Sequence, residues 1–195
     1  FIVLIVLLIF FSIKAANFLS LNTAMLIAKH VALYGILGIG MTYVIITGGI
    51  DLSVGAIVGL AGMIAGGLLE KGLTLQMFGV TLPAVFIITM LLGVVIGTLN
   101  GLVITRFNVA PFIATLGMMY VARGFAMIRS GGATYSKITG NEALGNTGWE
   151  VFGRNIPGTV IPVGVVILAI IAVIAAVILR KTAFGWHVLS IGGNE

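Results

Sequence analysis

The stretch Gly-Gly-Ile-Asp-Leu-Ser-Val-Gly, residues 48–55, interrupts a long apolar region with two adjacent glycines and one carboxylate. In a membrane this stretch is costly. Each glycine costs a helix about 1 kcal/mol, and a central aspartate costs about 2.5–3.5 kcal/mol on insertion scales. Non-helical backbone at membrane depth persists only where protein or a water-filled cavity surrounds it. We therefore expect the functional site here. The candidate site residues are Gly48, Gly49, Asp51, Ser53 and Gly55.

The same stretch predicts a break between two helices. If one helix ends at Gly48-Gly49 and the next begins near Leu52, Asp51 occupies the N-cap position, where its carboxylate accepts hydrogen bonds from free backbone N–H groups. The Ser53 hydroxyl is a further partner for this carboxylate. A glycine-interrupted apolar segment is also the sequence feature that marks a transport site built from broken helices. Two interpretations of Asp51 stay open: a structural cap, or a residue of the transport site.

The composition indicates an integral membrane protein. Hydrophobic residues make up 60% of the chain and charged residues 8%, whereas a soluble domain has about 25% charged residues. Mean hydropathy is +1.26. The 10 basic residues are scattered and not clustered, which argues against nucleic-acid binding. The chain has no cysteine, so it has neither a disulfide framework nor a thiolate metal site.

The apolar segments predict an all-α, polytopic membrane protein. Residues 1–13 are too few to cross about 30 Å of hydrocarbon, which takes about 20 residues, and we expect residues 1–195 to form one transmembrane domain that is incomplete at both ends. The predicted membrane-spanning segments are residues 25–47, 52–69, 83–105, 112–128 and 159–179. Glycines at four-residue spacing, as in Gly93, Gly97 and Gly101, predict close helix packing.

Two polar residues inside these spans have two interpretations each. Asn100 could line a transport pathway or make a hydrogen bond between helices. Arg123 could face an aqueous cavity or extend its guanidinium to the nearby membrane surface. We retain both as candidate pathway residues.

Residues 130–158 form a long polar, glycine-rich stretch, which is typical of a functional or disordered loop. Arg180 and Lys181 end the last span and favour a cytoplasmic location for that end. The basic residues of the other loops oppose this orientation, because Lys14, Lys71, Arg129, Lys137 and Arg154 fall on the other side if each segment spans once. Counting charges therefore leaves the orientation open.

Three blocks in order resemble the signatures of one family. Residues 40–55 read GMTYVIITGGIDLSVG, residues 111–124 read PFIATLGMMYVARG, and residues 182–195 read TAFGWHVLSIGGNE. Together they closely resemble the ribose-type sugar permeases, which are the membrane subunits of bacterial ABC importers. The family's permeases are longer than this chain. The resemblance adds Phe112 and Thr115 to the candidate pathway residues. It also implies that the third block contacts an ATPase, with coupling residues Thr182, Gly185, Gly192, Gly193, Asn194 and Glu195.

The resemblance implies a multi-pass subunit of the bacterial cytoplasmic membrane that carries a ribose-like monosaccharide. Its partners would be an ABC ATPase, an extracytoplasmic sugar-binding protein and a second permease copy or paralogue. The chain has no Gly-x-x-x-x-Gly-Lys-Ser/Thr phosphate loop and no paired acids or Cys/His cluster for catalysis. We therefore expect no enzyme activity, cofactor or metal in this chain, with ATP hydrolysed by the partner.

Other functions stay open from the residues alone. A channel or a proton-coupled carrier is one alternative; the carrier needs intramembrane acids that load and release protons, and Asp51 is the single candidate in the spans. An ABC permease for another small polar solute and a non-transporting scaffold also fit. In the last block, the glycines at 185, 192 and 193 allow turns that would set a short interfacial helix against a partner. Asn194 and Glu195 would lie near the start of that helix, where the helix dipole favours an acidic side chain.

Overall fold

The computed structural model describes residues 1–71, 82–135, 138–140 and 142–192. Over these residues the fold is all-α, as predicted, and the only β pairing is an isolated bridge between Asn155 and Pro162. The elements in order are α1 Ile2–Lys14, α2 Leu21–Ile46, α3 Val54–Lys71, α4 Leu82–Phe107, α5 Pro111–Ser130, the 3-10 helices η1 Glu142–Leu144 and η2 Trp149–Gly153, α6 Val163–Lys181 and α7 Ala183–Gly192.

Among the described residues, four helices are long and apolar enough to cross a membrane: α2, α4, α5 and α6. At most 11% of the most apolar window in any of them is buried within the described part of the chain. The helix α3 has 18 residues, a length of about 27 Å, which is slightly less than the hydrocarbon core. The exposed apolar side chains are suited to contact lipid or further protein.

The helix ends follow from local sequence. Ser20 caps α2 by accepting a hydrogen bond from Thr23 N–H at 3.2 Å. Pro111 is the first residue of α5, where its missing N–H costs nothing. Gly131 follows α5 with φ +63°, the left-handed conformation that ends many helices.

The predicted start of the last span is wrong by four residues. The α6 helix begins at Val163 and not at residue 159, because residues 155–162 fold into a tight hairpin. Its hydrogen bonds join Ile156 N–H to Ile161 O at 2.9 Å and Val163 N–H to Arg154 O at 3.1 Å. These bonds use backbone groups that a longer helix would need.

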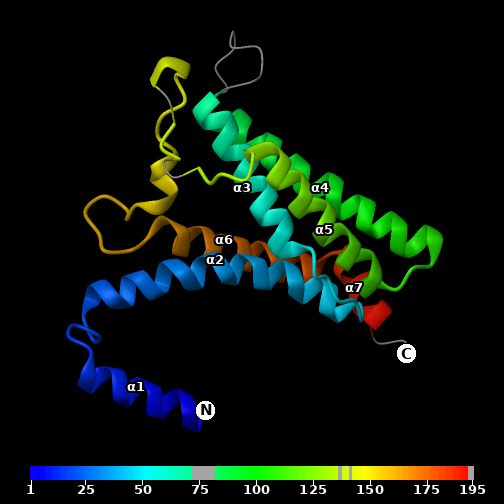
Figure 1. Cartoon of the computed structure of the whole chain (residues 1–195). Coiled ribbons are helices and arrows are strands. Elements are labelled where there is room, and N and C mark those ends of the chain that lie inside the picture. Colours follow the sequence, from blue (N-terminus) through cyan, green and yellow to red (C-terminus); the bar gives the residue numbers. More distant parts are fainter. Residues whose placement is uncertain (72–81, 136–137, 141, 193–195) are drawn as a thin grey trace.

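Apart from α1, the α-helices form two groups (Figure 1). In the first, α2 and α6 run parallel, with Gly35 beside Leu168 and the Tyr43 hydroxyl donating to Ala175 O at 2.6 Å; α7 packs on both. In the second, α3 packs on α4 and α5. The second group holds two small cores, one around Leu69 and Val85 and the other around Leu60, Ile96 and Ala122. Further members of these cores are Ala56, Ala65 and Leu68.

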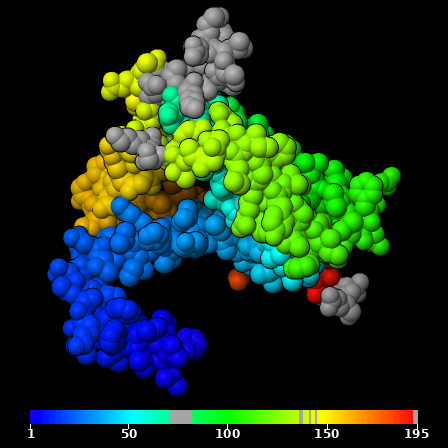
Figure 2. All heavy atoms as spheres, in the orientation of Figure 1, coloured from blue at the N-terminus to red at the C-terminus, as the bar shows by residue number. Residues whose placement is uncertain are grey.

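Two chain segments join the groups. One is the break between α2 and α3, at the end of the molecule that also carries α7 (Figure 1). The other contains the described residues 131–135, 138–140 and 142–162, which lie at the opposite end (Figure 2). Part of this second segment is packed and not freely exposed: the buried Asn146 donates to Leu69 O at 3.2 Å, and Trp149 packs on the core around Val85. The described residues of this second segment and the helix α7 therefore lie at opposite ends of the helices.

Candidate functional site

The break between α2 and α3 is real, as the glycine pair predicts. The helix α2 ends at Ile46, and Gly48 has φ +74°. Gly48 N–H donates to Ile45 O and Gly49 N–H donates to Val44 O, both at 3.0 Å. This is the Schellman pattern of helix termination, which places a left-handed residue after the cap and favours glycine there. The two glycines thus have distinct roles, since a Cβ at Gly49 would come within 3.2 Å of the Val44 side chain.

The predicted cap position of Asp51 is wrong by two residues. The helix α3 begins at Val54, and Ser53 O accepts the first helical bond from Ile57 N–H at 2.9 Å, so Ser53 occupies the N-cap position. Asp51 Oδ1 instead accepts from Ser53 N–H at 2.7 Å and from the Ser53 hydroxyl at 2.6 Å. A short polar side chain that bonds the backbone two residues ahead forms an Asx turn. Asp51 therefore holds the N-cap residue in place.

Asn100 connects this turn to α4. Its side-chain Nδ2 donates to Ser53 Oγ at 3.0 Å, and the exposed fractions are 5% for Asn100 and 0% for Ser53. Of the two interpretations of Asn100, the geometry matches the hydrogen bond between helices. The bonds Asp51–Ser53–Asn100 form a continuous polar chain, in which the Asn100 amide and the Ser53 hydroxyl each donate to an acceptor.

Thr115 connects the break to α5. Its hydroxyl oxygen accepts from Leu52 N–H at 3.2 Å and lies 3.2 Å from Ile50 O and 2.8 Å from Pro111 O. A hydroxyl has one proton, so it donates to one of these carbonyls at a time. Thr115 is 2% exposed. Residues 50–53 are thus fastened to α4 and α5 by hydrogen bonds. Residues 48 and 49 are instead hydrogen-bonded to the last turn of α2.

Three candidate residues lie apart from this polar chain. Phe112 is 49% exposed. Gly55 has open space where a Cβ would stand. Arg123 is exposed on α5, and within the described residues its guanidinium makes no hydrogen bond or ion pair. These three residues remain predictions as pathway or signature residues.

Residues 183–192 of the third block form the helix α7, so the turn predicted at Gly185 is wrong. The helix start predicted near Asn194 and Glu195 falls outside the described residues. Thr182 Oγ accepts from Gly185 N–H at 3.2 Å and donates to Ile178 O at 2.6 Å, so a threonine cap starts the helix. Gly185 lies within the first turn of α7. Gly193, Asn194 and Glu195 lie outside the described residues.

The last residue of α7 reaches the end of α2. A Cβ at Gly192 would overlap the backbone carbonyl of Ile46, and a Cβ at Gly185 would overlap the carbonyl of Leu179. The rings of Phe184 and Tyr43 stack with centroids 6.3 Å apart. The helix α7 is therefore packed on the final turns of α2, directly before the break.

Sequence reasoning missed Tyr43 and Ile46 as members of this site. Tyr43 lies in the first signature block, and its hydroxyl is the feature that could have marked it, because a buried tyrosine hydroxyl usually has a partner. Nothing in the sequence identified Ile46, since only its backbone carbonyl takes part.

Comparisons with known proteins identify the family. The family model described as the permease component of branched-chain amino acid transport systems matches residues 23–195. The chain belongs to this permease family. The ribose import permease protein of Bacillus subtilis is 40% identical to it over 100% of this chain and 56% of the relative. The ribose import permease protein of Escherichia coli K12 is 32% identical over 100% and 57%, and a fructose import permease protein of Bifidobacterium longum is 38% identical over 82% and 46%.

This permease chain spans little more than half the length of those relatives. No solved structure matches the chain. The family membership agrees with the all-α fold and the four apolar helices. Within the part of the chain that the structure describes, no three His, Asp or Glu side chains gather as a metal site would require.

Proposed function

We propose that this chain belongs to the translocating subunit of a binding-protein-dependent ABC importer in the bacterial cytoplasmic membrane. The observation that carries the proposal is the match along the whole chain to a ribose import permease protein at 40% identity. In this proposal residues 1–195 are part of a single transmembrane domain. The subunit itself is non-catalytic, uses no cofactor and depends on ATP hydrolysis by a partner ATPase.

The proposed substrate is a monosaccharide similar to ribose. The family model is described by branched-chain amino acids, but the relatives that match over the whole chain include ribose import permeases, and a fructose import permease matches over 82% of it. A sugar is neutral and rich in hydroxyls, so hydrogen-bonding groups and not ion pairs would bind it.

The proposed mechanism uses the break as a pivot between the two helix groups. Gly48 and Gly49 continue the end of α2, whereas residues 50–53 are fastened to α4 and α5 through Asn100 and Thr115. A force on α7 would reach α2 through Ile46 and Tyr43. Rigid movement of one helix group against another is a common route to alternating access.

The proposed orientation places α7 in the cytoplasm, against the ATPase, and residues 130–158 outside, where a sugar-binding protein would dock. The count of basic residues opposes this orientation, so labelling decides it. A cysteine at Thr147, an exposed position of the loop, should react with an impermeant thiol reagent added outside intact cells. A cysteine at Ser190, an exposed position of α7, should react only after the membrane is opened. The reverse pattern would contradict the orientation.

The transport test uses the full-length permease reconstituted with its ATPase and binding protein. We expect uptake of radiolabelled ribose that requires ATP on the side of the membrane where the ATPase lies. A protonophore should leave this uptake unchanged. Uptake without ATP that a protonophore abolishes would instead establish a proton-coupled carrier. In the same complex, a Ser190→Cys variant should cross-link to the ATPase, and a Thr147→Cys variant should not.

A further inference from the structure

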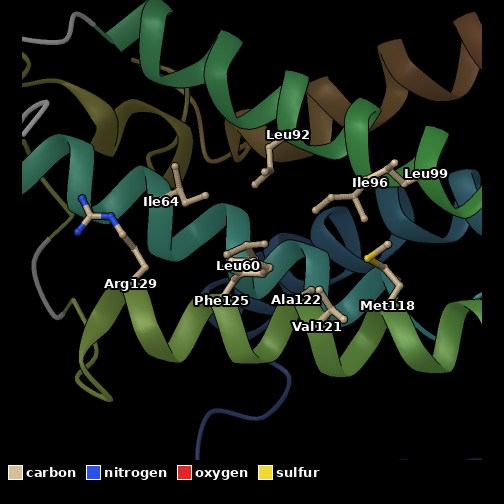
Figure 3. Close-up of a pocket in the computed structure, with 10 residues that line it drawn as sticks. All are labelled: Leu60, Ile64, Leu92, Ile96, Leu99, Met118, Val121, Ala122, Phe125 and Arg129. Atoms are coloured by element: carbon tan, nitrogen blue, oxygen red, sulfur yellow. The ribbon is translucent and has the colours of Figure 1, made fainter.

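An apolar groove of about 380 Å³ runs along the second helix group (Figure 3). Leu60 and Ile64 of α3 form its floor, Leu92 and Leu99 belong to the α4 wall, and Met118 belongs to the α5 wall. Nine of its ten lining side chains are apolar. This volume is within the range of small-molecule sites, which is about 300–1,000 Å³. A ligand of this groove must be apolar along most of its length.

The tenth lining residue is Arg129, which stands at one end of the groove in Figure 3. Its guanidinium lies over Gly67 of α3, where a Cβ would come within 2.7 Å of Nη2. Within residues 1–71, 82–135, 138–140 and 142–192 Arg129 has no ion pair; the salt bridge there joins Arg154 and Glu150. The groove thus offers a positive charge at one end and hydrocarbon elsewhere.

The length of the groove matches one leaflet of a bilayer. From Met118 to Arg129 the helix α5 rises about 16 Å at about 1.5 Å per residue. Half of the hydrocarbon core is about 15 Å. Arg129 precedes the last residue of α5, Ser130, so it lies where a helix meets the interface and Met118 lies near the middle of the span. A transmembrane helix would need contact over the whole thickness, whereas an acyl chain needs only this half.

We propose that the groove binds one anionic phospholipid, with an acyl chain along α3, α4 and α5 and with the phosphate headgroup at Arg129. Charge complementarity selects the headgroup, because an arginine fork forms paired hydrogen bonds with phosphate oxygens. The apolar lining selects the chain, since each buried CH₂ adds to lipid binding. The site lies on a different helix group from α7 and its contacts with α2.

The headgroup test uses the full-length permease, released for native mass spectrometry from nanodiscs of equal parts phosphatidylglycerol and phosphatidylethanolamine. Wild type should retain one phosphatidylglycerol in preference to phosphatidylethanolamine by about fivefold, the effect of one basic residue at a membrane surface. Arg129→Gln should remove this preference. Arg123→Gln is the matched control, because Arg123 is an exposed arginine of the same helix that does not line the groove, and it should keep the preference.

The chain test fills the groove. Val121 lines it and is 49% exposed, so Val121→Trp should occupy the space without breaking a buried core and should abolish the retained lipid. Ile113→Trp is its control, because Ile113 is 61% exposed on the same helix outside the groove. Both variants should keep the monodisperse elution and the melting temperature of the wild type, which separates lost lipid from lost folding.

Three outcomes would overturn the proposal. Equal retention of the two lipids by wild type would remove the headgroup assignment. A lower melting temperature of Arg129→Gln with an unchanged lipid preference would show that Arg129 only stabilises the negative, C-terminal end of the α3 dipole. A photoreactive residue at position 121 that links to another protein segment and not to lipid would show that a helix covers the groove.

Discussion

Gly192, the last residue of α7, lies directly against the backbone carbonyl of Ile46, the last residue of α2. The contact joins the block that resembles an ATPase-contacting segment to the helix end that precedes the break. The contact leaves no room for a side chain at position 192, because the opposing atom is a backbone oxygen and cannot rotate away.

We predict that Gly192→Ala weakens coupling. A Cβ would push α7 away from α2, and overpacking of this kind typically costs about 1–3 kcal/mol. ATP-dependent sugar uptake by the full importer should fall, while ATP hydrolysis continues. Gly38→Ala is the control, since it adds the same methyl group at a helical position with nothing within 4 Å of the new Cβ. Normal uptake by Gly192→Ala at normal protein level would contradict the coupling role.

Gly48→Ala should destabilise the break. Gly48 has φ +74°, and a left-handed conformation costs a residue with a Cβ roughly 1–2 kcal/mol. The matched control is Gly38→Ala, at a helical position with open space around a Cβ, which should be neutral or stabilising. Melting of the purified permease measures both. If the two substitutions shift the melting temperature equally, the left-handed conformation of Gly48 does not contribute to the stability of the permease.

Thr115→Val keeps the shape of the side chain and removes the hydroxyl that fastens residues 50–52 to α5. Leu52 N–H would then lose its bond to Thr115, and the loss of a typical hydrogen bond costs about 0.5–1.5 kcal/mol. Thr98→Val is the control, because Thr98 is exposed and bonds only within α4. We expect lower thermal stability and lower uptake for Thr115→Val only. Equal values for the two variants would refute the fastening role.

Substitutions of Asp51 separate hydrogen bonding from charge. Asp51→Ala removes the acceptor of two bonds from Ser53 and should cost about 1 kcal/mol and impair uptake. Asp51→Asn keeps one acceptor oxygen and should retain most of the uptake. A complete loss in Asp51→Asn, equal to that in Asp51→Ala, would show that the carboxylate charge is required and would revive the proton-coupled carrier.

The sequence predicted the features that depend on neighbouring residues. The glycine pair predicts the break because a left-handed residue after a helix is a local backbone requirement, and the apolar segments predict the spans because their length must match the bilayer. The local prediction was less accurate in its details. Asp51 was assigned to the N-cap that Ser53 occupies, since both residue types favour caps and spacing alone does not choose between them.

The tertiary structure alone decided which distant residues complete the site. Asn100 contacts Ser53 across 47 positions of sequence, and Thr115 contacts Ile50 across 65. Nothing in a single sequence shows which face of one helix packs against which face of another. The packing of α2 along α6 likewise brings Gly192 to Ile46. Side-chain hydroxyls and amides satisfy many partners equally well, so their pairing depends on how whole helices pack and not on the residues that flank them.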